Sequence, residues 1–191
     1  KKHNVLFIAD EVQTGIARTG KLLACDYENV HPDILILGKA ISGGVYPISA
    51  VLSSDAIMDV IHPGQHGSTF GGNPVAASVA ISALEVIKDE NLADNAMQLG
   101  RYFRSELAEL CKSSNIAKSV RGKGLLNALI INNEGHKNLA WDICLKLAEN
   151  GLLAKPTHTN IIRFAPPLVI SKDQITECVE IIKRTIKQVK G

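Results

Sequence analysis

Two kinds of hydrophobic pattern alternate along the chain, and together they predict an α/β fold. Residues 5–9 and 34–37 are apolar without interruption, which is typical of strands buried on both faces of a parallel sheet. Other short apolar runs predict strands over residues 48–52, 125–131, 152–154 and 160–165. Between these runs, apolar residues recur at three- and four-residue intervals, as on the buried face of a helix. Strands that alternate with helices favour a sheet with helices packed on it.

The longest helices are predicted from the residues that would form their buried faces. A helix capped by Asn91 would bury Leu92, Ala96, Leu99, Phe103, Leu107 and Leu110. A final helix, preceded by the capping box Ser171-x-x-Gln174, would bury Ile175, Val179, Ile182 and Ile186. A helix with Pro74 in its first turn would bury Val75, Val79, Ala83, Leu84 and Ile87. Further helices are expected over residues 138–149, ending at Asn150-Gly151, and, as short segments, over 55–61 and within 18–29.

Composition excludes several classes of protein. With 46% hydrophobic and 21% charged residues, the chain is typical of a globular protein, and a net charge of +2 is too small to favour binding to nucleic acid. No apolar stretch approaches the roughly 20 residues that span a bilayer. The cysteines, at positions 25, 111, 144 and 178, form no CxxC pair, so neither a metal site nor a disulfide framework is predicted. They favour a reducing compartment, and we expect the cytoplasm, with the mitochondrial matrix as the alternative.

Lys39 is the first candidate for chemistry. It follows the apolar run 34–37 and is surrounded by the flexible residues Gly38, Gly43 and Gly44. A lysine just past a buried strand lies at the carboxyl edge of the sheet, where open α/β sheets bind ligands. Burial there can lower its pKa and leave a neutral amine that attacks a carbonyl group. The alternative is a surface lysine in an ordinary turn.

A carboxylate is expected at the same edge. The run 5–9 ends at Asp10 and Glu11, and Asp10 could cap the turn, hold a metal or pair with a protonated ring nitrogen. If the strands before Asp10 and Lys39 are parallel neighbours, both side chains reach one edge of the sheet. A lysine that binds an aldehyde, and an aspartate that keeps a pyridine nitrogen protonated, are what an aldehyde cofactor on a pyridine ring needs.

Two further segments could bind anions. Ser68 and Thr69 lie shortly before the helix that starts near Pro74, and the start of a helix favours anions through its unpaired N–H groups. The alternative is a plain loop with a helix N-cap. Arg163 interrupts an apolar strand, so it should face a cleft or a carboxylate, because burying an unpaired guanidinium is costly. Its alternative is an arginine on an edge strand, in a structural ion pair.

Several long stretches resemble one known family. They are LFIADEVQTGIARTGKLLACDYENVHPDILILGKAISGGVYPISAVL, HGSTFGGNP, VRGKGLLNALI and NGLLAKPTHTNIIRFAPPLVI. These stretches resemble the pyridoxal-phosphate-dependent aminotransferases that act on terminal amino groups, the class III or ω-aminotransferase family. The resemblance runs from residue 3 essentially to the C-terminus, with irregular stretches near 112–118 and 132–138.

The resemblance implies a fold and a domain division. The fold would be that of a fold-type I transferase, with part of its large mixed-sheet domain and its smaller C-terminal α/β domain. Residues 1–90 would be the second half of the cofactor-binding large domain, and residues 91–191 the connecting helix and the small domain. The family's phosphate-binding glycine loop and the aromatic residue stacked on the cofactor cannot be located here. We therefore expect the chain to be the C-terminal part of a longer protein.

The resemblance also implies roles at the cofactor. Lys39 would hold pyridoxal phosphate as a Schiff base, and Asp10 would keep its ring nitrogen protonated. The amide of Gln13 would reach the phenolic oxygen of the cofactor; otherwise Gln13 is a solvent-facing loop residue. Thr69, with Ser68 beside it, would reach the cofactor phosphate of the neighbouring subunit, which implies a homodimer with a shared active site.

The resemblance is strongest to members that move the δ-amino group of ornithine to 2-oxoglutarate, which gives glutamate semialdehyde and glutamate. In that reaction Arg163 would bind the α-carboxylate of the amino-acid or keto-acid substrate.

The residues are also compatible with three other interpretations of what the chain does. The chain could belong to another ω-aminotransferase, acting on acetylornithine or 4-aminobutyrate, or be an inert structural or dimerising part of one. An apolar strand followed by Asp-Glu also occurs in P-loop ATPases. Those proteins need a Gly-Lys-Ser/Thr loop, whereas the Gly-Lys pairs here are followed by Leu22, Ala40 and Gly124.

Overall fold

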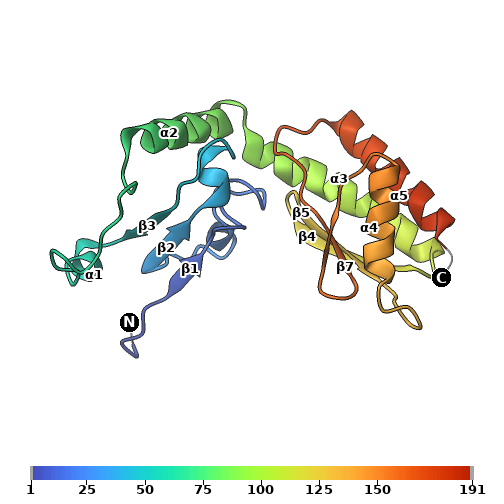
Figure 1. Ribbon diagram of the computed structural model, residues 1–191, viewed down its shortest axis with the longest axis horizontal. Coiled ribbons are helices and arrows are strands. Elements are labelled where there is room, and N and C mark those ends of the chain that lie inside the picture. Colours follow the sequence, from blue (N-terminus) through green and yellow to red (C-terminus); the bar gives the residue numbers. More distant parts are fainter. Residues whose placement is uncertain (1, 190–191) are drawn as a thin grey trace. The chain divides into compact units, whose positions relative to one another are not determined.

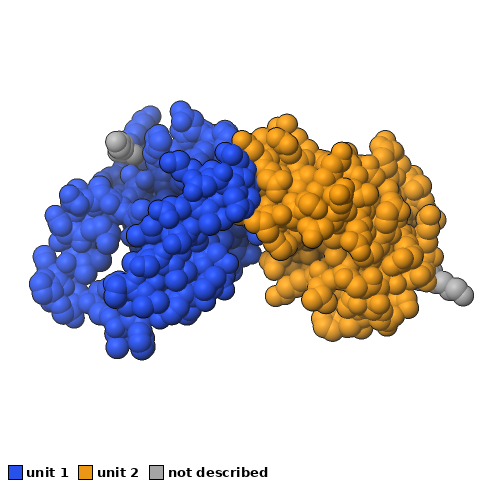
Figure 2. Space-filling model, turned by 90° about the horizontal axis from the view of Figure 1, so that it is seen from above, with its two compact units in different colours: residues 1–93 blue, residues 94–191 orange. Residues whose placement is uncertain are grey.

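A computed structural model describes residues 2–189. The chain divides into two compact units, of which unit 1 ends at Ala93 and unit 2 begins at Asp94 (Figure 2). No helix among the described residues combines the length and the apolar composition that a membrane span needs. Each unit is built around its own sheet (Figure 1).

Unit 1 contains a three-stranded sheet in the order β1-β2-β3, with strands Ile8–Asp10, Ile34–Leu37 and Ala50–Ser53. β1 and β2 are parallel, and β3 returns antiparallel to β2. The strands predicted from the runs 34–37 and 48–52 are therefore present. Two 3-10 helices lie in its loops, η1 at Ala24–Tyr27 and η2 at Lys39–Ser42, and a short helix, α1, covers Asp55–Met58.

The prediction that residues 5–9 form a strand buried on both faces is wrong for this chain. β1 contains only Ile8–Asp10, and Val5, Phe7 and Ile8 are 70%, 47% and 52% exposed. β1 is an edge strand, paired with β2 alone in the three-stranded sheet, so few neighbouring side chains cover it. Most of the apolar run at residues 5–9 is therefore exposed in this chain.

The long helix of unit 1, α2, covers Pro74–Asp89 and begins as predicted, with Pro74 in its first turn. Its N-cap is Asn73, whose side-chain oxygen accepts a hydrogen bond from the Ala76 amide at 2.9 Å. The predicted buried face is confirmed at Ile87 and wrong at Val75 and Leu84, which are exposed, and Val79 and Ala83 are half-buried. The buried residues of α2 are Ala76, Ala80 and Ile87. Ala76 and Ala80 are small and four residues apart, so the helix can lie close to its neighbours along this face. A prediction based on large apolar residues does not detect such a face.

Unit 2 packs three helices on one face of an antiparallel sheet. The strands are ordered β4-β5-β7-β6. They cover Ala117–Lys123 (β4), Leu126–Ile131 (β5), Lys155–Thr157 (β6) and Ile161–Phe164 (β7). The helices cover Leu92–Ser113 (α3), Leu139–Glu149 (α4) and Lys172–Gln188 (α5).

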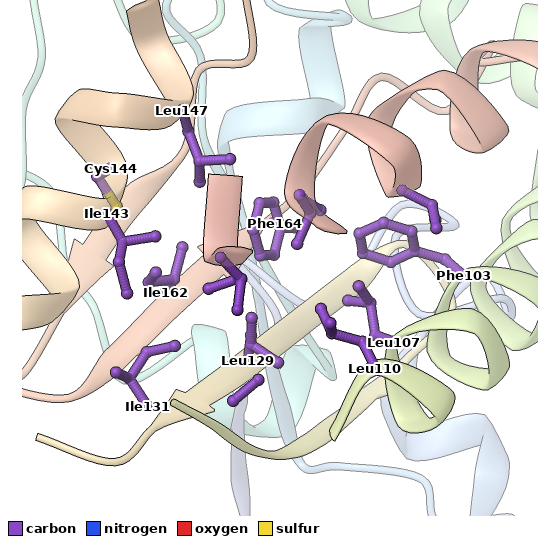
Figure 3. Packing of buried hydrophobic residues seen from close by; sticks show 14 of the residues in the cluster. Phe103, Leu107, Leu110, Leu129, Ile131, Ile143, Cys144, Leu147, Ile162 and Phe164 are labelled. Carbon is purple, nitrogen blue, oxygen red and sulfur yellow. The ribbon is translucent and has the colours of Figure 1, made fainter. Parts of the chain in front are cut away.

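The buried faces predicted for α3 and α5 are confirmed at every position. They pack with Leu129, Ile131, Ile162 and Phe164 of the sheet into one core (Figure 3), where the rings of Phe103 and Phe164 meet edge to face at 5.6 Å. The capping box at Ser171 and Gln174 is also present. The helical periodicity of these segments therefore identifies the core of unit 2 correctly.

Two strands of unit 2 differ from the prediction. β4 is missed, because its sequence, AKSVRGK, is mostly polar and only Ala117 is buried. β6 lies at Lys155–Thr157, just after the predicted run 152–154, of which Leu153 is 87% exposed. Both strands lie at the edges of the sheet, where burial, and with it the hydrophobic signal, is weakest.

Candidate active site

The structure brings Asp10 and Lys39 to one edge of the unit 1 sheet. Asp10 is the last residue of β1 and lies opposite Ile36 of β2 in the parallel register. β2 ends at Leu37, and Lys39 opens η2 two residues later. Because parallel strands share their direction, both residues lie at the carboxyl edge of the sheet. The strand pairing therefore places both residues at the edge of the sheet where the sequence predicts them.

Lys39 has an unusual backbone. Its φ is +46°, in the left-handed region that few non-glycine residues adopt, and it follows the extended Gly38. Strained positions of this kind persist when the surrounding structure holds them, and they cluster at functional sites. The burial expected for Lys39 is not provided by this chain, since its side chain is exposed.

Asp10 forms a local turn as well as reaching the sheet edge. Its Oδ1 accepts a hydrogen bond from the Val12 amide at 3.1 Å, so the capping interpretation is partly correct. A carboxylate has two oxygens with several acceptor sites, and this bond is compatible with a second donor such as a pyridinium N–H. The Asp10 side chain is exposed in this chain.

Glu11, its neighbour, has a structural role that the sequence did not reveal. It is buried, and its carboxylate accepts hydrogen bonds from the Thr14 hydroxyl and from the Cys25 amide, the latter at 2.8 Å. Burial raises its pKa, but the bonds from Thr14 and from the backbone of Cys25 and Ala24 outweigh burial and lower the pKa below its usual value. Glu11 thus closes the loop that follows Asp10.

That loop is tightly built. Ile16 and Ala17 are buried, and both have left-handed φ values, +54° and +67°. A Cβ at Gly15 would lie 2.8 Å from the carbonyl oxygen of Glu11, so only glycine fits there. Gln13 lies exposed between Asp10 and Gly15, and it belongs to the same loop at the carboxyl edge. A positive φ strains the backbone of a β-branched residue such as Ile16, and no sequence pattern predicts this strain.

Ser68 and Thr69 lie in the exposed loop that precedes α2. The Ser68 hydroxyl accepts a hydrogen bond from the Gly71 amide at 2.9 Å, while Asn73 caps the helix. The N-cap of α2 is Asn73, so the segment has the form of a loop followed by a capped helix, which the alternative interpretation describes. α2 packs against η2, the segment that starts at Lys39, and a Cβ on Gly43 would be 3.6 Å from that of Ala83.

Arg163 belongs to unit 2 and is not on an edge strand. β7 lies between β5 and β6, and Ile162 and Phe164 on either side of Arg163 are buried in the core. The Arg163 side chain therefore projects from the opposite face of the sheet, where it is half-buried. This position corrects the edge-strand alternative.

The residues of unit 1 fit pyridoxal phosphate by their chemistry. The cofactor presents an aldehyde, a ring nitrogen and a phosphate, and this unit offers an amine and a carboxylate at one sheet edge and hydroxyls before a helix. The described residues contain no group of three or more His, Cys, Asp or Glu that could hold a metal ion. The described cysteines, at 25, 111, 144 and 178, carry free thiols.

Comparison with known proteins gives a consistent result. The family described as Aminotransferase class-III matches residues 1–186. The chain is 63% identical over 185 residues to the mitochondrial ornithine aminotransferase of Drosophila ananassae, and this match covers 97% of the chain and 42% of that protein. The chain thus spans less than half the length of the curated relatives it matches.

Solved structures match nearly the whole chain. A crystal structure of acetylornithine aminotransferase from Elizabethkingia anophelis is 64% identical to this chain, with a TM-score of 0.94. The match covers 98% of this chain and 47% of the Elizabethkingia anophelis chain. The ornithine aminotransferase of Toxoplasma gondii, described with partial occupancy of PLP at its active site, is 49% identical with a TM-score of 0.93. That match covers 98% of this chain and 44% of the Toxoplasma gondii chain.

Proposed function

This chain belongs to the class-III aminotransferases, and we propose that the complete protein transfers the δ-amino group of ornithine to 2-oxoglutarate with pyridoxal phosphate as its cofactor. The observation that carries the proposal is the parallel pairing of β1 and β2, which places Asp10 and Lys39 at one sheet edge. The products would be glutamate and glutamate semialdehyde. Relatives named ornithine aminotransferase, at 63% and 60% identity, support ornithine as the substrate.

Each residue at the sheet edge has a distinct task in this proposal. When bound, the cofactor supplies an electron-withdrawing ring that stabilises negative charge on the substrate carbon. Lys39 would hold the aldehyde through Nζ, and its amine would act as the general acid and base that carries the proton between the substrate carbon and the cofactor carbon. The Asp10 carboxylate keeps a proton on the ring nitrogen, and the Gln13 amide donates to the phenolic oxygen.

The phosphate and the substrate carboxylate are assigned to other segments. Ser68 and Thr69 precede the start of α2, and we assign them to the phosphate of the cofactor held by a second subunit. The proposed active protein is therefore a homodimer whose sites are shared between subunits. Arg163, on the outer face of the unit 2 sheet, binds the α-carboxylate of the amino-acid or keto-acid substrate.

A second candidate substrate is acetylornithine. The acetylornithine aminotransferase of Elizabethkingia anophelis is as similar to this chain as the ornithine aminotransferase relatives are, at 64% identity. The two substrates differ in the charge of the α-nitrogen, which is an ammonium in ornithine and a neutral amide in acetylornithine. Comparing kcat/KM for the two amines with the complete enzyme decides between them.

The mitochondrial matrix is proposed as the compartment alongside the cytoplasm. Relatives in Drosophila ananassae and Rattus norvegicus are named as mitochondrial proteins. The free thiols of the described cysteines agree with the reducing conditions of either compartment.

The decisive experiment traps the cofactor on its lysine. The complete protein is incubated with pyridoxal phosphate, reduced with borohydride and digested, and mass spectrometry locates the added group. We expect it on Lys39, and we expect Lys39→Ala to abolish both trapping and transamination. Lys88→Ala is the matched control, because Lys88 is an exposed lysine of the same unit on α2. Trapping elsewhere, or full activity of Lys39→Ala, would reject the proposal.

A further inference from the structure

The outer face of the unit 2 sheet carries a row of positive charges that crosses all four strands. In the antiparallel register, Arg121 of β4 lies opposite Ala128 of β5, Ala128 lies opposite Arg163 of β7, and Arg163 lies opposite Lys155 of β6. Residues directly opposite each other in a sheet project from the same face. Arg163 and Lys155 are therefore direct neighbours on this face, and Arg121 lies in the same line on the other side of Ala128; we call Arg121, Arg163 and Lys155 the cationic row.

The burial of neighbouring residues shows that the cationic row lies on the face of the sheet opposite the helices. The neighbours of Arg163 along β7, Ile162 and Phe164, are buried beneath the helices, whereas Arg121 and Lys155 are exposed. Neighbouring strands are about 4.8 Å apart, so the Cα atoms of the cationic row extend over roughly 14 Å. The row lies wholly within unit 2.

The described strands of unit 2 add no acidic side chain to this face. The described strands of unit 2, with sequences AKSVRGK, LNALII, KPT and IIRF, contain no aspartate or glutamate. The acidic residues of this unit lie on helices and loops, where Glu106 and Glu180 pair with Lys183. Like charges directly opposite in a sheet are destabilising, as Lys155 and Arg163 are here.

We infer that Lys155 and Arg121 extend the binding site of Arg163 into a charge-selective surface, which favours a dianionic keto acid over a cationic amino acid. This inference rests on the proposed function. At neutral pH, 2-oxoglutarate carries two carboxylates, whereas ornithine carries one carboxylate and two ammonium groups, a net charge of +1. The field of the row attracts the first and repels the second. Lys155 and Arg121 act through this field, and need not contact the reacting atoms.

Charge selection predicts opposite shifts for the two substrates. In the complete, cofactor-loaded enzyme, Lys155→Ala and Arg121→Ala should each raise KM for 2-oxoglutarate roughly two- to five-fold, the range for one partly exposed charge pair. KM for ornithine should stay constant or fall. The shifts should shrink in 1 M salt, where the screening length drops to about 3 Å. A merely structural role would raise both KM values together.

Matched controls remove the same charges from the helical side of the unit. Lys187→Ala and Arg184→Ala each remove one exposed cation from α5. We expect these controls to leave the ratio of the two KM values unchanged.

A second measurement does not depend on turnover. Glutarate, a five-carbon dicarboxylate without the keto group, is titrated into the complete protein by calorimetry. Lys155→Ala and Arg121→Ala should weaken glutarate binding, and the two α5 controls should not. Equal glutarate affinity in all four variants would overturn the inference. Absence of transamination in the unsubstituted enzyme would instead reject the proposed function, and the glutarate measurement would still test the cationic row.

Discussion

Replacing Gly100 with alanine should destabilise unit 2, although alanine is the better helix former. Gly100 is a buried residue of α3. A Cβ there would overlap the carbonyl group of Gly124 and lie 2.9 Å from its Cα. Gly124 belongs to the turn between β4 and β5, and Arg104 holds that turn by donating to the Gly124 carbonyl at 2.8 Å and to Asn127 Oδ1 at 2.7 Å. The helix therefore meets the turn backbone to backbone.

Two opposing effects set the size of the change. Helix propensity favours alanine over glycine by about 1 kcal/mol. The overlap with Gly124 is an overlap with backbone, so rotating a side chain cannot relieve it, and α3 or the turn must move. Overpacking of this kind costs about 1 to 3 kcal/mol, and occasionally more. Because the overlap is with backbone, we take the upper end of this range and expect a net loss of about 2 kcal/mol, or roughly 8 to 16 °C in Tm for a unit of this size.

Scanning calorimetry of the complete protein measures the loss, and hydrogen exchange of the α3 amides shows whether it arises in unit 2. Gln98→Ala is the control, because Gln98 is exposed on the same helix and its replacement changes helix propensity alone. A Gly100→Ala protein that is as stable as the parent, or more stable, would refute the close approach of α3 to the turn.

Three further predictions concern caps and titrating groups. Ser171→Ala should lower the free energy of unfolding by about 1 kcal/mol, because the Ser171 hydroxyl accepts the Gln174 amide at the start of α5; urea denaturation tests this. Glu11→Gln should cost about 1 to 3 kcal/mol at pH 7, because it weakens the bonds to the Thr14 hydroxyl and the Cys25 amide. Since the Glu11 pKa is lowered from its usual value of 4.5, its stabilisation is present above that pH and lost as the pH falls through the folded pKa, so the difference between Glu11→Gln and the parent should vanish in acid. Burial raises the pKa of Cys144 from 9.0 to about 11, so its contribution to stability should be complete below pH 9 and lost as the pH rises toward 11. Alkylation of the folded protein at pH 8 should accordingly modify Cys144 far more slowly than after unfolding.

The helices show which structural features can be predicted from the pattern of consecutive residues. The predicted faces of α3 and α5 are buried throughout, and the capping box at Ser171 is formed, because periodicity and caps are properties of consecutive residues. α2 shows the limit of the same method. Its large apolar residues Val75 and Leu84 are exposed, and its small residues Ala76 and Ala80 are buried, because contact with neighbouring segments decides which face is covered.

By itself, the sequence determined the family, the position of Lys39 just beyond a strand, the position of Asp10 at the end of another, and the core helices of unit 2. These features depend on short segments and on residue identity. Tertiary structure alone decided that β1 is an exposed edge, that Arg163 is on an inner strand, and that Arg121, Arg163 and Lys155 share one row. It also decided the contact of Gly100 with Gly124. Strand order and register bring together residues that are far apart in the chain. The contacts that stabilise this pairing are between such distant residues, so the pattern within a short segment of sequence cannot predict it.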